Sequence, residues 1–161
     1  NDRRHQFKAF GAYQISDEWR VCGSLLVDSG RPRSCTSYYP TADAGLYNGA
    51  YYHFCGLAGS GTAPGSAGYV APSADYAFSP RGSKGEAPWN YTLNLSLAYT
   101  PLWADKKLTL QADVLNVLNR QVATFYYSNY STDRVTPDAR YNQALGYTSP
   151  RQVRLSARYD F

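Results

Sequence analysis

The sequence predicts an all-β fold, namely five antiparallel strands of a membrane-spanning β-barrel, and three observations lead to this prediction. Five segments of the 161-residue chain alternate apolar and polar residues with a period of two, which is the periodicity of a strand with two different faces. Short and long connections alternate between these segments. A transmembrane helix needs about 18 consecutive apolar residues, and the chain, with a mean hydropathy of -0.49, contains no such run.

The first two strands are expected over residues 5–15 and 18–30, with a tight turn at Ser16 and Asp17 between them. The alternation is weaker in the first strand than in the others. In the second strand Leu26 interrupts the polar row. Its apolar row consists of Trp19, Val21, Gly23, Leu25 and Val27.

The third and fourth strands are expected over residues 88–100 and 107–118, with a short turn at residues 104–106. The fourth strand alternates up to Val114, and its pattern then slips over residues 115–118, which indicates a β-bulge or the point where the strand leaves the membrane. The third strand separates its two faces completely. Its apolar row consists of Trp89, Tyr91, Leu93, Leu95, Leu97 and Tyr99.

The fifth strand is expected over residues 150–161 and separates apolar from polar residues just as completely. A tilted strand needs about 9–11 residues to cross the hydrocarbon layer, and the length of each of the five segments is close to this. The polar row of the fifth strand carries Arg154, Arg158 and Asp160. The apolar row consists of Val153, Leu155, Ala157, Tyr159 and Phe161.

The two long connections, residues 31–87 and 119–148, are rich in Gly, Ser, Pro and Tyr and are expected to be surface loops. Outer-membrane barrels have short periplasmic turns and long extracellular loops. With the C-terminus in the periplasm, both long connections fall outside the cell and both short turns inside. Aromatic residues at the strand ends fit the two membrane interfaces. The alternative is a soluble β-sandwich whose aromatic residues pack a core.

Cys35 and Cys55 lie in the first long connection and are expected to form a disulfide bond. Closing a loop of this length would stabilise the fold by about 3 kcal/mol in an oxidising compartment. The alternative is two free thiols. Cys22 lies alone on the polar face of the second strand, so it suggests no nucleophile.

The remaining candidates for chemistry are sparse. His5 and His53 are the only histidines, and neither has partners at the spacing of a metal site or of a catalytic triad. The glycine-rich segments lack the spacing of a phosphate-binding loop. The arginines are spread along the chain rather than clustered. We therefore expect no enzyme activity, no cofactor, no metal and no nucleic-acid partner.

Tyrosines in the long connections are candidate ligand contacts, because amphipathic aromatic rings bind sugars, peptides and similar ligands. Packing of the loops against each other explains them equally well. These residues are Tyr38, Tyr39, Tyr51, Tyr52, Tyr126 and Tyr127. Charged residues on the polar faces are interpreted chiefly as ion pairs between neighbouring strands, and otherwise as a wall that contacts a plug or a substrate. They are Arg20, Asp113, Arg154 and Arg158.

Residues 113–121, in which two apolar residues separate Asn116 from Asn119, resemble the penultimate-strand motif of TonB-dependent outer-membrane receptors. One loop later the chain has a closing strand that ends in an aromatic residue, Phe161. Within that family the chain looks most similar to the Oar-like receptors. The segments behind this likeness are residues 29–32 with Cys35 shortly after, and residues 80–85 leading to Trp89.

The resemblance implies a barrel of 22 strands, of which these five would be the last, in a Gram-negative outer membrane. Residues 1–161 would be the C-terminal part of one barrel domain, and the chain, which has no methionine, is expected to be a piece of a longer protein. The plug and the segment that engages TonB would lie outside it. Ala157, Tyr159 and Phe161 would be the signal read by the barrel assembly machinery.

The implied function is energy-coupled uptake of an unidentified extracellular ligand. Its implied partners are the membrane lipid, the rest of the barrel with its plug, the TonB complex and the assembly machinery. Two alternatives stay open: a surface adhesion or structural barrel that transports nothing, and a secreted carbohydrate-binding β-sandwich.

Overall fold

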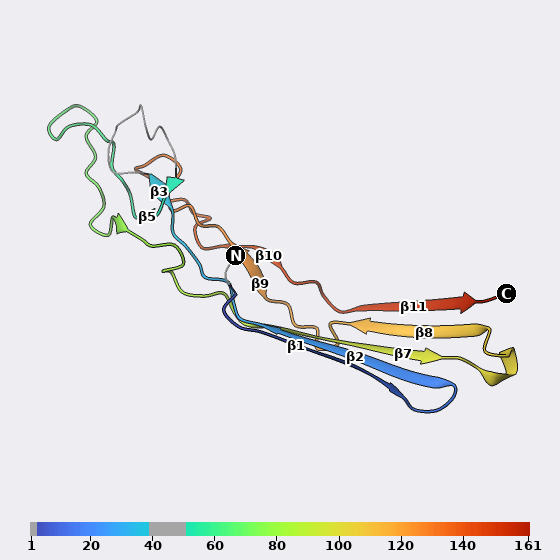
Figure 1. Cartoon of the computed structure of the whole chain (residues 1–161). Coiled ribbons are helices and arrows are strands. Elements are labelled where there is room, and N and C mark those ends of the chain that lie inside the picture. The colour runs from blue at the N-terminus through green and yellow to red at the C-terminus, as the bar shows by residue number, and fades with distance from the viewer. Residues whose placement is uncertain (1–2, 39–50) are drawn as a thin grey trace. The chain divides into compact units, whose positions relative to one another are not determined.

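A computed structural model describes residues 3–38 and 51–161 of the chain and shows an all-β protein with antiparallel sheets (Figure 1). Five long strands form one sheet in the order β1-β2-β7-β8-β11. These are β1 (Gln6–Gln14), β2 (Trp19–Asp28), β7 (Asn90–Tyr99), β8 (Leu108–Leu115) and β11 (Gln152–Tyr159). Within the described residues, no helix has the length and apolar character needed to cross a membrane.

The shorter strands form three separate pairs. Strand β3 (Ser37–Tyr38) pairs with β4 (Tyr51–Tyr52), β5 (Phe54–Cys55) pairs with β6 (Ala77–Phe78), and β9 (Ala123–Tyr126) pairs with β10 (Ala144–Tyr147). A single-turn 3-10 helix, η1 (Leu102–Ala104), lies between β7 and β8.

The chain divides into two compact units, which we describe separately. The sheet unit contains Arg3–Gly30, Pro88–Val122 and Tyr147–Phe161. The loop unit contains Arg31–Ala87 and Ala123–Gly146, and so consists of most of the two long connections. Each expected strand is present, shortened by a few residues at its ends, and the expected antiparallel pairing is confirmed. The β9–β10 pair was not expected, because these strands are short and lie inside a segment read as loop.

Register in the large sheet aligns residues of one kind across all five strands. One row contains Tyr13, Val21, Leu97, Ala112 and Leu155. The next row, whose side chains point to the opposite face, contains Ala12, Cys22, Ser96, Asp113 and Arg154. The sheet therefore has one apolar face and one predominantly polar face.

Burial in the central strands of this sheet is the reverse of that in a soluble domain, whereas β1 and β11 are exposed on both faces. In the central strand β7, Leu95 and Leu97 are 42% and 40% exposed, whereas Ala98, on the polar face, is 7% exposed. Asp113 on the same polar face is 4% exposed. The buried hydrophobic residues of the described chain are small or medium-sized: Cys35, Ala58, Ala87, Ala98 and Val122. No large apolar side chain in the described residues is buried to that degree.

Both short turns fold as expected. Between β1 and β2, the backbone N–H of Ile15 donates to the carbonyl of Trp19. Between β7 and β8, Asp105 and Lys106 adopt the left-handed conformation, with φ of 49° and 61°. The Glu18 carboxylate accepts a hydrogen bond of 2.9 Å from the backbone N–H of Leu102, so the two turns are tied together.

Candidate functional site

The apolar face carries aromatic residues at both ends of its strands. At the short-turn end, Trp19 stacks on Tyr99 with ring centroids 4.5 Å apart. At the other end, the Arg120 guanidinium lies 3.8 Å from the centre of the Tyr91 ring and donates to the carbonyl of Trp89. Amphipathic rings at the two edges of an apolar band are the arrangement found at membrane interfaces.

A depression of about 550 Å³ lies on the apolar face near the short turns. Its walls are Trp19, Leu97, Tyr99, Leu110, Gln111, Ala112, Leu155, Ser156 and Ala157. Nearly all of its surface is apolar, so a hydrocarbon chain would fit its chemistry better than a polar ligand.

The residues expected to form the assembly signal lie together at the end of β11. Ala157 and Tyr159 pair with Leu110 and Leu108 of β8. Phe161 is fully exposed, and its ring contacts that of Tyr159 edge to face, with centroids 5.5 Å apart. The three side chains share the apolar face, as the alternation predicts, and their role in assembly stays a prediction.

Strand β8 ends at Leu115, and Asn116 begins a turn in which the backbone N–H of Asn119 donates to the Asn116 carbonyl at 2.8 Å. The register of β7 with β8 would place Asn116 opposite Leu93, yet it is the backbone N–H of Val117 that donates to the Leu93 carbonyl, at 2.8 Å. Asn116 has a φ of 50°, a left-handed conformation that asparagine tolerates better than most residues. The slip over residues 115–118 coincides with the end of β8. Its two interpretations, a β-bulge and the point where the strand leaves the membrane, stay predictions.

The two motif asparagines join the end of β8 to the start of β11. Asn116 is 5% exposed, and its Nδ2 donates to the carbonyls of Arg120 and Ser149 at 3.0 and 2.8 Å. Its Oδ1 accepts from the backbone N–H of Arg120. The Oδ1 of Asn119 accepts from the backbone N–H of Arg151 at 2.9 Å. The motif therefore fixes the backbone on both sides of the second long connection.

On the polar face, the expected ion pair between neighbouring strands exists for Asp113 and Arg154. The Arg154 guanidinium lies 2.8 Å from the Asp113 carboxylate, which also accepts from the Gln111 side chain at 2.7 Å. Arg158 instead pairs with Asp160 of its own strand end, at 2.9 Å. The charges thus serve pairing within the sheet more than an open polar wall.

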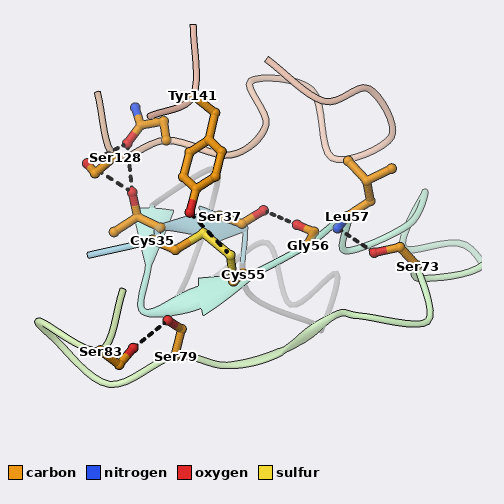
Figure 2. The surroundings of a disulfide bond; sticks show 12 residues. Cys35, Ser37, Cys55, Gly56, Leu57, Ser73, Ser79, Ser83, Ser128 and Tyr141 are labelled. Atoms are coloured by element: carbon orange, nitrogen blue, oxygen red, sulfur yellow. Dashed lines mark hydrogen bonds between the residues drawn. A yellow bond between two sulfur atoms is a disulfide. The ribbon is translucent and has the colours of Figure 1, made fainter. Parts of the chain in front are cut away.

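Figure 2 shows the expected disulfide bond between Cys35 and Cys55 in the loop unit. Cys35 is completely buried. The hydroxyl of Ser37 donates to the Gly56 carbonyl at 2.8 Å, and the hydroxyl of Tyr141 lies 3.8 Å from the Cys55 sulfur. The disulfide prediction is confirmed, and Cys22 is a free cysteine in the sheet unit.

The expected loop tyrosines make contacts inside the loop unit. The Tyr38 hydroxyl donates to the Thr132 carbonyl at 2.7 Å. The Arg33 guanidinium lies 5.0 Å from the centre of the Tyr126 ring, and the Arg140 guanidinium lies 4.6 Å from the centre of the Tyr127 ring. These contacts favour packing of the loops against each other over an exposed ligand surface.

The other three expected tyrosines, Tyr39, Tyr51 and Tyr52, do not distinguish loop packing from a ligand surface. Tyr52 is half-buried in β4, next to Tyr51. Tyr39 lies outside the described residues.

Hydrogen bonds hold two loop carboxylates in the ionised form. Hydrogen bonds from the Arg140 side chain and backbone lower the pKa of Asp138 from 3.8 to about 2. The backbone N–H of Thr136 is the main cause of a lowered pKa at Asp133. Burial raises the pKa of Tyr141. Asp133 and Asp138 are therefore both negatively charged at neutral pH.

Sequence reasoning missed the arginine–aromatic pairs of the loop unit. Arg31 lies over Phe125 and Arg33 over Tyr126, at 4.7 and 5.0 Å from the ring centres. Each pair joins residues that are distant in the chain, so no local period reveals it. The one available signal was the Arg31-Pro32-Arg33 alternation, which puts two cations on one side of an extended segment.

Within the described residues, no group of three or more His, Cys, Asp or Glu side chains is placed to hold a metal ion. Comparison with protein families, with curated proteins and with solved structures found no match to the chain.

Proposed function

We propose that this chain is the C-terminal barrel segment of a TonB-dependent outer-membrane receptor that takes up a ligand with energy supplied through TonB. The observation that carries the proposal is the apolar face of the sheet, on which every one of the five strands exposes large apolar side chains, whereas Ala98 and Asp113 in the middle of the polar face are buried. Lipid would cover Leu95, Leu97 and their row, and the polar face would line the barrel interior. The membrane location, the family and the uptake activity are all part of this proposal.

The open edges of the sheet support a larger barrel. Strands β1 and β11 end the strand order, so each has one row of backbone N–H and C=O groups without a strand partner in the described chain. In lipid each unpaired group would cost several kcal/mol, so further strands must cover both edges. The long strands have 8 to 10 residues, near the length that crosses the hydrocarbon layer.

In the proposed topology, the two short turns and Phe161 face the periplasm and the long connections face the cell exterior. The loop unit would then contribute to ligand capture, and the TonB complex would act through a plug formed by another part of the protein. Phe161, with Tyr159 and Ala157, would be read by the barrel assembly machinery.

The test of transport is the coding sequence upstream of this chain. A plug domain and a short TonB-binding segment there, together with ligand uptake that stops when the proton-motive force is dissipated, are expected. A complete barrel gene without a plug would refute the proposal.

A surface adhesion or structural barrel is the second candidate, and one observation favours it. The disulfide and the arginine–tyrosine contacts brace the loop unit internally, as expected of a fixed surface structure. Uptake that is independent of TonB, or absent, would favour this candidate. The scarcity of buried large apolar residues in the described chain counts against a soluble β-sandwich.

A further inference from the structure

The depression of about 550 Å³ on the apolar face arises from two alanines in rows of larger side chains. Ala112 of β8 lies between Leu97 of β7 and Leu155 of β11 in the register of the sheet. Ala157 pairs with Leu110 in the next apolar row, towards the short turns. An alanine side chain ends at Cβ, so the neighbouring leucines extend beyond it. The two alanines therefore form the floor of the depression, and the leucines form its sides.

The end of the depression nearest the short turns is a fixed aromatic wall. Trp19 stacks on Tyr99 with ring centroids 4.5 Å apart. The Tyr99 hydroxyl donates to the Glu18 carboxylate at 3.5 Å, and the same carboxylate accepts from the Leu102 N–H at 2.9 Å. A ligand that enters a site with walls already in place does not have to order them.

The depression stays open when the sheet becomes part of a larger barrel. A further strand paired with β11 would lie about 4.8 Å farther along the sheet, beside Leu155 and not above Ala112. On the other side, β7 is already covered by β2. In a two-fold dimer the same patch meets itself, so a dimer centred here would set one hollow against another and leave both empty. A ligand of another kind must fill it, and its volume is that of a small-molecule site, about 300–1,000 Å³.

Two lysines lie in the turn at this end of the sheet. Lys107 precedes Leu110 by three residues, which is about 10 Å along the strand. Lys106 and Lys107 are exposed, and neither forms an ion pair with a described carboxylate. Both ammonium groups are therefore available to a phosphate next to the apolar band.

Carboxylates lie at the same end, so it carries both signs of charge. Glu18 accepts from the Leu102 N–H, and Asp160 is paired with Arg158. Asp17 and Asp105, each in one of the short turns, are exposed. A headgroup with one phosphate and one ammonium group complements both signs.

We propose that the depression binds one phospholipid with a zwitterionic, amine-bearing headgroup. One acyl chain lies over Ala112 and Ala157, the phosphate contacts Lys106 and Lys107, and the ammonium group faces the carboxylates of the short turns. The inference rests on the proposed function, because it requires the apolar face to lie in a membrane. It goes further in fixing one lipid at one place on the wall, which general coverage by lipid does not require.

The test uses the complete protein that carries this chain, folded into vesicles of phosphatidylethanolamine and phosphatidylglycerol. The probe is phosphatidylethanolamine with a photoreactive diazirine on one acyl chain, and mass spectrometry locates the labelled residues after illumination. Tyr13 and Val21 are the reference, because they share the cross-strand row of Leu97 and Leu155 but lie outside the depression. We expect labelling of Leu97 and Leu155 to exceed that of the reference about threefold or more, since added carbon contacts and the charges both favour the site.

The variant Ala112→Leu/Ala157→Leu fills the floor, so labelling of Leu97 and Leu155 should fall to the level of the reference. Ala9→Leu is the matched control, since Ala9 pairs with Leu25 on the same face outside the depression, and it should leave the labelling unchanged. The urea midpoint in the vesicles verifies that each variant folds.

A second pair of variants tests the headgroup without altering the depression. Lys106→Gln/Lys107→Gln should lower the labelling about twofold or more. Lys8→Gln, on the polar face, should leave it unchanged.

Three results would overturn the site: equal labelling of the depression and the reference, weaker labelling of the depression, as for a hollow filled by protein, or equal losses in Ala112→Leu/Ala157→Leu and Ala9→Leu. Labelling that does not respond to the lysine variants would overturn a phospholipid as the occupant. No labelling anywhere on the apolar face would reject the membrane proposal itself, whereas equal labelling along the face rejects the lipid site alone.

Discussion

Replacing Leu155 by arginine should prevent the sheet from entering a membrane, because Leu155 lies in the middle of β11 on the apolar face. It is 77% exposed, and its neighbour in β8 is Ala112. In a soluble sheet, an exposed leucine can become arginine at little cost, within about 0.5 kcal/mol. In a barrel wall the same position faces hydrocarbon.

The expected magnitude follows from that exposure. Arginine on the lipid face of a barrel costs about 2–4 kcal/mol near the bilayer midplane. About three quarters of the Leu155 surface would contact lipid, and the loss of this contact costs about 1–2 kcal/mol more. A total of about 3–6 kcal/mol corresponds to a shift of the folding equilibrium by a factor of roughly 100 or more.

The assay is folding of the complete protein that carries this chain into lipid vesicles, titrated with urea and followed by tryptophan fluorescence. Ser156→Arg is the matched control, since Ser156 is the next residue, is also exposed and points to the polar face. We expect Leu155→Arg to lower the urea midpoint strongly and Ser156→Arg to leave it nearly unchanged. Equal effects of the two variants, or folding of both without lipid or detergent, would refute the assignment of the faces.

Four further predictions concern separate parts of the chain. Cys35→Ser should destabilise the loop unit by about 3 kcal/mol. In urea unfolding followed by tyrosine fluorescence, the variant should have a lower midpoint than the unaltered protein, and adding a reductant should no longer change that midpoint. Asn116→Ala should cost about 1–3 kcal/mol in urea unfolding, because it leaves buried backbone groups without partners, and Asn116→Gly should not rescue it although glycine accepts the positive φ. The pKa of Asp138 is lowered in the folded chain, so its contribution to the free energy of unfolding should be complete above about pH 4 and lost as the pH falls towards about 2. In acid titrations of stability, Asp138→Asn should abolish this pH dependence. A pH dependence unchanged by the variant would contradict the role of Asp138. Deleting Phe161 should sharply reduce the amount of the full protein in outer-membrane fractions, and unchanged amounts would reject its role in assembly.

The strands were predictable because each has two chemically different faces. The apolar residues from Leu108 to Val114 and from Val153 to Tyr159 each repeat with a period of two. The position of each strand, the residues that share one face and the neighbouring strand therefore follow from the sequence. The end of β8 was also predictable, since the alternation breaks after Val114. The disulfide followed from the presence of only two cysteines in the same long connection.

The loop unit was much less predictable, because its contacts join residues far apart in the chain. Arg31 and Phe125 are in different connections, and no periodicity links them. The roles of the motif asparagines were hidden for the same reason. Asn116 binds the carbonyl of Ser149, which lies on the other side of the second long connection. Resemblance indicated that Asn116 matters, whereas only the structure shows what its amide binds.

The position of the disulfide also bears on the order in which the chain folds. Strands β2 and β7 pair across about 60 residues, from Asp28 to Asn90, and the Cys35–Cys55 bond shortens that path by about 20 residues. Loop-closure entropy depends only on the logarithm of loop length, so the shorter path eases the pairing by only about 0.3–0.4 kcal/mol. Pairing of β2 with β7 therefore does not have to wait for oxidation. The sheet can form while the cysteines are still reduced, and the bond can be made afterwards.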